Sequence, residues 1–391
     1  MSGAARPTIL HLAVDVNTPQ RPHTTSAIEW LVEELGDYDN VVIAYRRTPR
    51  PWGLREVDCG SPRGYRLYHF PFLGLPAGVG LLSAMRLAAR RTIRRLERDG
   101  IRPAMIHAHK LTFEGLAAWS IARHFGVPFV VSLRGEVETK VFRMKPTYRP
   151  LLRRICAAAE RIYFVSAWFR DEYHRHVPAQ PAKERLLPNI VRNIRHAIVP
   201  QPPGARFVTI MSLDTQKRKG LSWLLEGFAA AARARPSLRL DIIGGGSAAS
   251  IARAEALIRR HALQDRVTLV GRMANAELLE QLPTYRALLL PSLNETFGMV
   301  YVEALFAGVP VLFTRGTGID GYLDGLDVGV AVRPRDANAV AAAILDLDAR
   351  ADELRANIAA AAPRLLETFD PARTVAGYRS DIEAVLAGHP A

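Results

Sequence analysis

Two glutamates, Glu295 and Glu303, lie in the segment of this chain whose residue types and spacing are best suited to chemistry. The segment begins PSLNETFGM at residues 291–299 and continues to Gly308. A strand, a polar loop and a helix that begins near Gly298 and ends at Gly308 are expected here. The first turn of such a helix offers free N–H groups and a positive dipole end to a diphosphate. The two glutamates could then bind hydroxyls of a sugar and a ribose, or could be a dipole partner and a solvated helix residue.

A lysine earlier in the chain could neutralise the same diphosphate. Lys219-Gly220 opens an expected helix shortly after the strand 207–211. An ammonium at this place would offset the charge that develops on a diphosphate leaving group. Lys217 and Arg218 could lie near the same phosphates, or could be ordinary solvated charges.

Two glycines after the expected strand 238–243 are a further candidate contact with a nucleotide. Gly244 and Gly246 belong to the pattern Gly-x-Gly-x-x-Ala, which allows close approach of the backbone to a nucleotide or simply forms a loop. A dinucleotide site would require an acidic residue at the end of the next strand, and that strand ends in Gly271 and Arg272. The pattern therefore does not indicate an NAD site.

His109 is the candidate catalytic residue in the first half of the chain. It follows the expected strand 105–108 and should stand at its carboxyl end, where α/β sheets bind their ligands. His107 is expected to face the opposite side. Arg134 follows the expected strand 129–133 and could bind an acidic acceptor or a phosphate. The imidazole of His109 could equally be a structural hydrogen-bonding group.

The loop after the first strand carries three hydroxyl groups. Residues 24–26 could cap the following helix and still donate hydrogen bonds to phosphate, and Thr25 is the candidate donor contact. The Asp-x-Asp pairs at residues 37–39 and 346–348 do not follow strands. We therefore predict no essential metal and no cofactor, with a lysine and a helix end meeting the diphosphate instead.

The two-glutamate segment resembles the signature of retaining GT-B glycosyltransferases of family 4. The resemblance extends over most of the chain, because the glycines after residue 243 and the segments 318–320 and 329–330 occur in the family's order. The match in the first half is looser. The resemblance implies two Rossmann-like domains, a UDP- or GDP-linked sugar in the second, an acceptor in the first, and transfer with retention of anomeric configuration.

The resemblance also implies roles for individual residues. Glu303 would bind the nucleotide ribose and Glu295 the donor hexose, and the base would lie near Arg272. The backbone of Phe297 and Gly298 would meet the sugar and the phosphate. The catalytic set is His109, Lys219 and Glu295, and the donor-binding set is Thr25, Arg218, Gly244, Gly246, Arg272, Phe297, Gly298, Met299 and Glu303.

Three features depart from the family's pattern. The arginine that the family places before the lysine is missing, and Lys217 or Arg218 is its candidate replacement. The paired glycines of the first loop are replaced by PHTTS at residues 22–26. Arg134 stands where many relatives have a histidine, which makes it a candidate acceptor residue.

These residues must be positioned by an α/β architecture. Strand-like and helical segments alternate along the chain, which predicts right-handed βαβ units and mostly parallel sheets. The alternation breaks at the proline-rich linker 198–204. We expect two doubly wound, Rossmann-like domains facing each other across a cleft. Residues 1–198 would bind the acceptor, residues 199–370 would bind the donor, and residues 371–391 would form a helix packing back toward the first domain.

Positive charge is concentrated in the first half. The chain has 52 Lys+Arg and 38 Asp+Glu, and the whole excess lies in residues 1–199. An amphipathic helix over residues 80–98 could bind an anionic membrane surface, with the apolar segment 70–82 as a wedge, or could be an ordinary solvated face. Opposite its apolar face the helix carries Arg86, Arg90, Arg91 and Arg94.

Composition narrows the class of protein. With 391 residues, 49% apolar and 23% charged, the chain is globular. Two distant cysteines suit a reducing compartment, and no apolar run could span a bilayer. We expect a cytoplasmic hexosyltransferase, peripheral on the inner membrane face, that uses a lipid-linked or saccharide acceptor in cell-surface polysaccharide or glycolipid synthesis. The alternatives are another GT-B enzyme, such as a sugar-nucleotide epimerase or phosphorylase, and a basic nucleic-acid-binding protein, which the 8% aromatic content disfavours.

Overall fold

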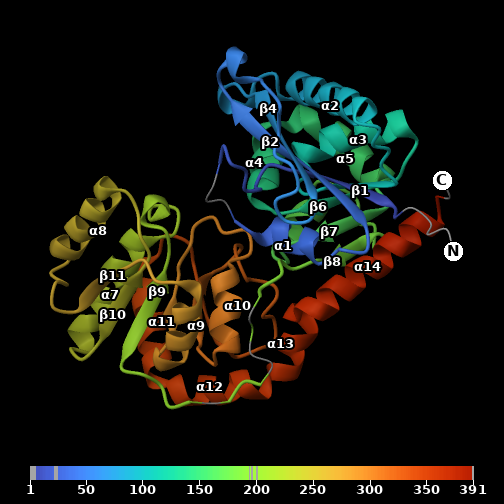
Figure 1. The fold of residues 1–391 in the computed structure, drawn as a ribbon. Helices are drawn as coiled ribbons and strands as arrows, with labels where there is room; N and C mark the ends of the chain where they lie inside the picture. Colours follow the sequence, from blue (N-terminus) through green and yellow to red (C-terminus); the bar gives the residue numbers. More distant parts are fainter. Residues whose placement is uncertain (1–5, 22–24, 193, 195–196, 200, 390–391) are drawn as a thin grey trace. The chain divides into compact units, whose positions relative to one another are not determined.

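The computed structural model describes residues 6–21, 25–192, 194, 197–199 and 201–389. The chain divides into two compact units (Figure 1). Unit 1 contains residues 1–165, 169–190 and 371–391, and unit 2 contains residues 166–168 and 191–370. The division thus falls before the proline-rich linker, and the C-terminal helix belongs to unit 1.

Unit 1 is built around a sheet with the strand order β3-β4-β2-β1-β5-β6-β7-β8, in which only the β3–β4 pair is antiparallel. Its central strands are continuous apolar runs because both faces of a parallel sheet are buried. The strands are β1 (Thr8–Ala13), β2 (Asp39–Thr48), β3 (Val57–Asp58), β4 (Arg66–Leu73), β5 (Met105–Ala108), β6 (Phe129–Leu133), β7 (Arg161–Phe164) and β8 (Glu184–Leu186).

Helices cover the sheet of unit 1 (Figure 1). The C-terminal helix buries Val375, Tyr378, Ile382 and Val385, a stripe at helical spacing that packs with the first helix over β1, β5, β6 and β7. The helices are α1 (Ala27–Glu33), α2 (Leu81–Arg98), α3 (Glu114–Phe125), α4 (Glu136–Met144), α5 (Arg149–Ala158), α6 (Phe169–His174) and α14 (Pro371–Ala387), with 3-10 turns η1 (Pro51–Gly53), η2 (Pro76–Gly78) and η3 (Pro146–Tyr148).

Unit 2 contains a parallel sheet with the strand order β11-β10-β9-β12-β13-β14. The strands are β9 (Arg206–Ile210), β10 (Arg239–Ile243), β11 (Val267–Gly271), β12 (Leu288–Leu289), β13 (Val311–Thr314) and β14 (Gly329–Val332). The helices are α7 (Leu221–Ala234), α8 (Ala248–Arg260), α9 (Asn275–Gln281), α10 (Met299–Phe306), α11 (Ala337–Ala349), α12 (Ala351–Ala360) and α13 (Ala362–Phe369), with 3-10 turns η4 (Leu213–Thr215) and η5 (Leu282–Thr284).

The expected α/β class with Rossmann-like parallel sheets is confirmed, while several local predictions need correction. Phe70 and Phe72 lie in the buried strand β4 and Leu81 is buried in α2, so the exposed part of the segment predicted as a wedge lies within residues 75–80. The single helix expected over residues 351–368 is two helices, because Pro363 stands in the first turn of α13. Helices α4 and α6 and strands β3, β4 and β8 were not expected from the sequence.

Candidate functional site

An ion pair between Lys219 and Glu295 joins two loops of unit 2. Lys219 follows β9 and Glu295 follows β12, and these strands are neighbours in the sheet. The N–H of Leu293 donates to the carbonyl of Arg218 at 2.8 Å, so a backbone bond also connects the loops. The two side chains are only 16% and 12% exposed. Two residues predicted separately from the sequence are therefore brought together by the sheet.

The backbone of Glu295 is anchored by a residue that sequence reasoning missed. The hydroxyl of Thr317 accepts a hydrogen bond from the Glu295 N–H at 2.6 Å and donates to its carbonyl at 2.8 Å. The N–H of Gly318 donates to the same carbonyl at 2.8 Å. A hydroxyl can act as donor and acceptor at once, so one threonine fixes both polar groups of this residue. The carboxylate is thereby held at a defined place beside Lys219.

Helix α10 begins directly after this loop, at Gly298. Gly298 has φ +77°, and a Cβ there would lie 2.5 Å from the ring of Tyr301. Tyr301 is itself held by a 2.6 Å hydrogen bond from its hydroxyl to the carbonyl of Leu290. No side chain among the described residues caps the start of α10, so its first N–H groups keep their capacity for an anion. Phe297 is fully buried, and Met299 is half-buried.

Glu303 lies in α10 and is half-buried. Burial raises the pKa of its carboxyl group from 4.5 to about 7. No hydrogen bond or ion pair joins this carboxyl group to the part of the chain that the structure describes. A buried carboxyl group without a hydrogen-bond partner is stabilised by any hydroxyl that donates to it. Its environment therefore suits the ribose contact that the sequence analysis assigned to it.

The glycines after β10 have a structural explanation. A Cβ at Gly244, where φ is +138°, would lie 1.8 Å from the carbonyl oxygen of Met211, and one at Gly246 would lie 2.9 Å from the Cβ of Leu213. Both glycines thus allow the loop after β10 to pack on the loop after β9. The contact of Gly244 and Gly246 with a nucleotide stays a prediction. Arg272 is exposed and its stem lies close to Gly245.

Arg218 hydrogen-bonds within its own unit. Its Nη1 donates to the carbonyl of Asn294 at 3.4 Å, next to the Lys219–Glu295 pair. Lys217 is exposed. Arg218 therefore lies at the loop that carries Glu295, but neither residue is established as the replacement for the missing family arginine.

Three histidines are stacked inside unit 1. His11 of β1, His107 of β5 and His109 just beyond it are at most 1% exposed, and the rings of His107 and His109 are 4.0 Å apart. His107 Nδ1 bonds the Tyr378 hydroxyl at 2.6 Å, and its Nε2 bonds the Ser132 hydroxyl at 2.8 Å. The expectation that His107 faces the opposite side is wrong, because residues two apart in a strand share a face.

Asn40 determines which nitrogens of His11 and His109 carry protons. Its Nδ2 donates to the carbonyls of Leu35 at 2.8 Å and Tyr38 at 3.3 Å, so Oδ1 is the atom that meets His11 Nε2 at 3.2 Å. An amide oxygen only accepts, so His11 Nε2 is protonated and its Nδ1 accepts from His109 Nε2 at 3.2 Å. Burial lowers the pKa of His11 to about 4 and that of His109 well below 6.5, so both rings are neutral. The lone pair of His109 is consequently on Nδ1.

The same three histidines are spaced as the ligands of a metal ion could be, because one ring nitrogen of each lies within 4.8 Å of the others. Hydrogen bonds engage both ring nitrogens of His11 and both of His107. A neutral imidazole has a single lone pair, so metal ligation would displace these buried bonds. Hydrogen bonding alone accounts for the arrangement, and metal independence stays a prediction.

A cluster of charged residues surrounds the carboxyl ends of β1 and β5. Lys110 Nζ lies 2.5 Å from Asp15 Oδ2. Burial opposes ionisation of Asp15, but the Lys110 ammonium holds the pKa of this carboxyl group below its usual value. Arg134 is 6% exposed and donates to the carbonyl of His109 at 3.1 Å and to Asn189 Oδ1 at 3.3 Å. Arg134 thus supports the backbone that carries His109.

Two fully buried glutamates complete this cluster. Glu114 Oε1 accepts from the Val14 N–H at 2.9 Å, and Glu138 Oε1 accepts from the Leu111 N–H at 3.3 Å. The second oxygen of each carboxyl group has no partner among the described residues. Burial raises the pKa of Glu114 to about 8 and also raises that of Glu138. Sequence reasoning missed both glutamates and Lys110 and Asp15, although residues directly after parallel strands gather at one sheet edge.

The first loop is described only in part. Residues 22–24 lie outside the described residues, so the prediction for Thr24 has no structural counterpart. Thr25 is exposed, and its hydroxyl accepts from the Ala27 N–H at 3.4 Å. Its proposed donation to phosphate stays a prediction.

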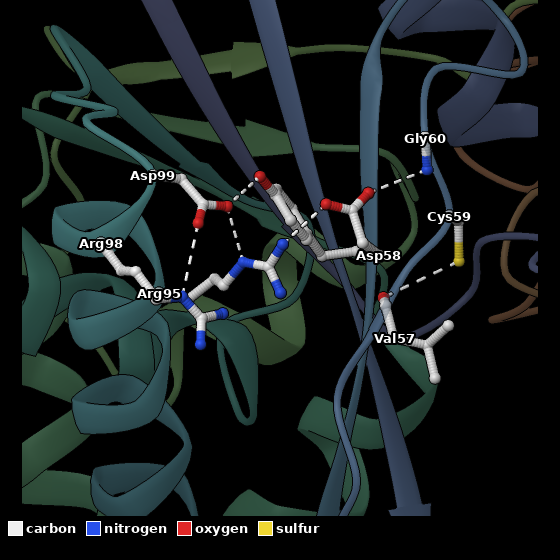
Figure 2. Close-up of polar contacts among 8 residues, drawn as sticks. Val57, Asp58, Cys59, Gly60, Arg95, Arg98 and Asp99 are labelled. Atoms are coloured by element: carbon white, nitrogen blue, oxygen red, sulfur yellow. Dashed lines mark hydrogen bonds and ion pairs between the residues drawn. The ribbon is translucent and has the colours of Figure 1, made fainter.

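The arginines of α2 fall into two groups, which corrects the single basic face expected from the sequence. Arg91 donates to Glu56 and to the carbonyls of Leu54 and Pro71. Arg95 bridges Asp58 and Asp99, as Figure 2 shows. These side chains fasten α2 to the β3–β4 region. The exposed group is Arg86, Arg90, Arg94 and Arg98.

Comparisons with known proteins identify related families and folds. Residues 20–190 match the family Glycosyl transferase 4-like domain, and residues 204–349 match the family Glycosyl transferases group 1. The D-inositol 3-phosphate glycosyltransferase of Streptomyces avermitilis is 27% identical over 291 residues, covering 68% of this chain and 62% of that protein. One component of the phosphatidylinositol N-acetylglucosaminyltransferase of Arabidopsis thaliana is 29% identical over 144 residues, covering 37% and 32%. The chain thus spans less than two thirds of these relatives' length.

Solved structures show the same fold over nearly the whole chain. The sucrose-phosphate synthase of Thermosynechococcus elongatus aligns with a TM-score of 0.73 at 20% identity, covering 98% of this chain and 100% of that chain. Anabaena HepE, solved with UDP and glucose, aligns with a TM-score of 0.67 at 15% identity, covering 96% and 99%. At these identities the likeness establishes the fold, which is GT-B. Within the described residues, no helix is long and apolar enough to cross a membrane.

Proposed function

Because this chain belongs to the group 1 glycosyltransferases, we propose that it transfers a hexose from a UDP- or GDP-linked sugar to a lipid-linked or saccharide acceptor. Transfer retains the anomeric configuration and needs no metal. The observation that carries the proposal is the Lys219–Glu295 pair beside the uncapped first turn of α10. A cation, a carboxylate and free helix N–H groups are together suited to a diphosphate joined to a sugar.

Each group of this site has a role in the proposed transfer. As the glycosidic bond breaks, negative charge grows on the diphosphate, and Lys219 and the first N–H groups of α10 stabilise it. Glu295 orients Lys219 and accepts a hydrogen bond from a hexose hydroxyl. Glu303 accepts hydrogen bonds from the ribose, where the donated protons offset the cost of its burial.

Unit 1 supplies the acceptor side of the proposal. The described residues leave His109 Nδ1 without a hydrogen-bond partner, so its lone pair can accept from a sugar hydroxyl. His11 and Asn40 act as positioning residues that hold this tautomer. The match to inositol phosphate and phosphatidylinositol glycosyltransferases supports an acceptor that bears phosphate. Lys110, in the charged cluster next to His109, would bind that phosphate. Arg134 supports the backbone that carries His109.

The proposal includes peripheral contact with the inner face of the cell membrane. The exposed arginines of α2 and the excess of positive charge in residues 1–199 support it. A basic residue near an anionic leaflet contributes about 1 kcal/mol, so three arginines suffice for measurable binding at moderate salt. The acceptor would be met at that surface, in the synthesis of cell-surface polysaccharide or glycolipid.

A donor screen followed by product analysis tests the function. UDP-, GDP- and ADP-sugars are compared by thermal shift, since a ligand at 100 times its Kd stabilises the protein by about 2.7 kcal/mol. The best donor is then incubated with inositol phosphate and with saccharide acceptors, with and without EDTA. We expect an acceptor-dependent product with the donor's anomeric configuration by NMR and a rate unchanged by EDTA. Isomerised donor without acceptor would indicate an epimerase, and a requirement for inorganic phosphate would indicate a phosphorylase.

A further inference from the structure

A cavity of about 450 Å³ lies in unit 1 beside the loop after β4 and helix α4. Phe72, Leu81 and Val141 are buried in its wall, and Phe113 is half-buried there. The volume falls within the range of small-molecule sites in proteins. Side chains of this kind offer no hydrogen bonds, so the walls suit a hydrocarbon rather than a sugar or a nucleotide.

The mouth of this cavity is also apolar, although it meets solvent. Leu75, Val79 and Met144 line it and are 39%, 62% and 74% exposed. Exposed apolar side chains scattered singly need no explanation, but three around one opening form a patch. Such a patch lowers the free energy of an apolar chain that enters the cavity from a membrane or from water.

Cations stand at the same opening. Arg47, Lys140 and Lys145 line the cavity, and no acidic residue does so among the described residues. Arg47 Nε donates to the carbonyl of Gly74 at 3.0 Å, and Lys145 Nζ donates to that of Gly78 at 2.9 Å. Carbonyl groups carry no net charge, so these bonds fasten the loop without neutralising either cation. Of these three cations, only Lys140 has an acidic partner within the described part of the chain, Glu136 at 3.5 Å.

We propose that this cavity binds one acyl chain of an anionic phospholipid, with the lipid phosphate held by the cations at its mouth. The combination of apolar walls, an apolar rim and excess positive charge matches an amphiphile with a negative headgroup. The inference rests on the proposed membrane association, because that association is what would give the lipid site its role. It adds a specific lipid site to the diffuse attraction of the α2 arginines, next to the start of that helix at Leu81.

Binding of a single lipid molecule tests the inference apart from catalysis. The probe is lysophosphatidylglycerol with a 16-carbon chain, below its critical micelle concentration, measured by isothermal titration calorimetry on the full chain. We expect one site per chain, binding at least tenfold tighter than lysophosphatidylcholine of the same chain length, and no binding of glycerophosphoglycerol. Equal binding of the headgroup alone would show a phosphate site, and several weak sites would show surface adsorption. Either result would overturn the proposal.

Matched variants locate the site. Val79→Asp and Met144→Asp place a carboxylate on the exposed rim, where folding tolerates it, and each should weaken lysophosphatidylglycerol binding at least tenfold. Leu87→Asp is the control, because Leu87 is 48% exposed on α2 but does not line the cavity, and it should change binding less than twofold. Unchanged binding in both rim variants, or equal loss in the control, would contradict the proposal.

The membrane and lipid inferences can fail separately. Charge reversal at Arg90 and Arg94 should reduce binding to phosphatidylglycerol vesicles while leaving binding of monomeric lysophosphatidylglycerol within twofold. If the wild-type chain binds the monomeric lipid but no vesicle, the cavity stands and the proposed membrane association is wrong. If it binds vesicles but not the monomeric lipid, the cavity proposal is wrong and the attraction is electrostatic alone.

Discussion

The candidate groups of unit 1 and of unit 2 are held in place in different ways. In unit 1, His11, His107 and His109 are buried and bonded to other side chains. In unit 2, Lys219 and Glu295 stand on loops whose backbones are joined by hydrogen bonds. Where buried side chains bond one another, a substitution changes both the position of its neighbours and the free energy of unfolding. Where the backbone of a loop is anchored, a side chain on that loop can be replaced with less change in the fold. Substitutions in unit 1 should therefore affect folding and function together, and those in unit 2 mainly function.

Lys219→Ala should give the largest effect on catalysis. Loss of one charge-stabilising group at a reacting centre lowers the rate by about 10²- to 10³-fold. We expect this loss in the transfer rate, with the free energy of unfolding lowered by about 1–3 kcal/mol because Glu295 loses its partner. Arg233→Ala, at the exposed end of α7, is the matched control. A variant that transfers within twofold of the wild-type rate would show that the donor site is wrongly placed.

Glu114→Gln should change how the stability of unit 1 depends on pH. Burial raises the pKa of Glu114 to about 8, although Lys110 acts in the opposite direction. The folded state keeps the proton that the unfolded state releases above pH 4.5, so this stabilisation is complete below pH 4.5 and is lost as pH rises through 8. From pH 6 to 9 the wild type should lose about 2–3 kcal/mol more than the variant in urea unfolding. Parallel curves would exclude a protonated Glu114.

Asn40→Leu tests whether Asn40, acting through His11, determines the tautomer of His109. The variant leaves the His11 Nε2 proton unpaired, which should lower the free energy of unfolding by about 2 kcal/mol. Nitrogen-15 shifts of labelled histidine should show mixed tautomers at His109, and transfer should slow by about tenfold. Asp39→Asn, at an exposed position of the same strand, should leave the shifts unchanged. A pure Nε2–H tautomer in Asn40→Leu would remove the positioning role.

Glu303→Gln should give the smallest effect, visible in the pH dependence of donor binding. Because the pKa of Glu303 is about 7, its ionised fraction rises roughly tenfold between pH 6 and 8. The ionised group accepts more ribose hydrogen bonds, so the Kd of the nucleotide sugar should fall by up to about tenfold over this range in the wild type. The variant should bind with a flat profile. Glu226→Gln, exposed on α7, should keep the wild-type slope.

Much of the fold was predictable because the spacing of apolar residues along the chain indicates helices and strands. The strands 105–108 and 129–133 have the bounds expected from the sequence, and the last helix begins at residue 371 as expected. Helices α4 and α6 were missed because each is short and follows a strand end without a clear cap. Strand β4 was missed because its aromatic run also suited a wedge. Only neighbouring strands could show that this run completes a sheet.

The candidate site was less predictable than the fold. Lys219 and Glu295 were found one by one, through the residue types and spacing of their loops, but their pairing required the neighbouring positions of β9 and β12. His11 and Asn40 were missed because nothing local distinguishes a polar residue of a buried strand. Their role appears only through the parallel register that sets His11 opposite His107.

The sequence by itself determined the α/β class, the family resemblance and the candidate cations and carboxylates of the second half. Each of these depends on apolar periodicity or loop motifs, which are properties of short stretches of chain. The tertiary structure alone decided which of these groups meet, which tautomer His109 adopts and which arginines of α2 remain exposed. Those outcomes depend on distances between strands and on burial. Such quantities arise only when segments far apart in the chain share one core.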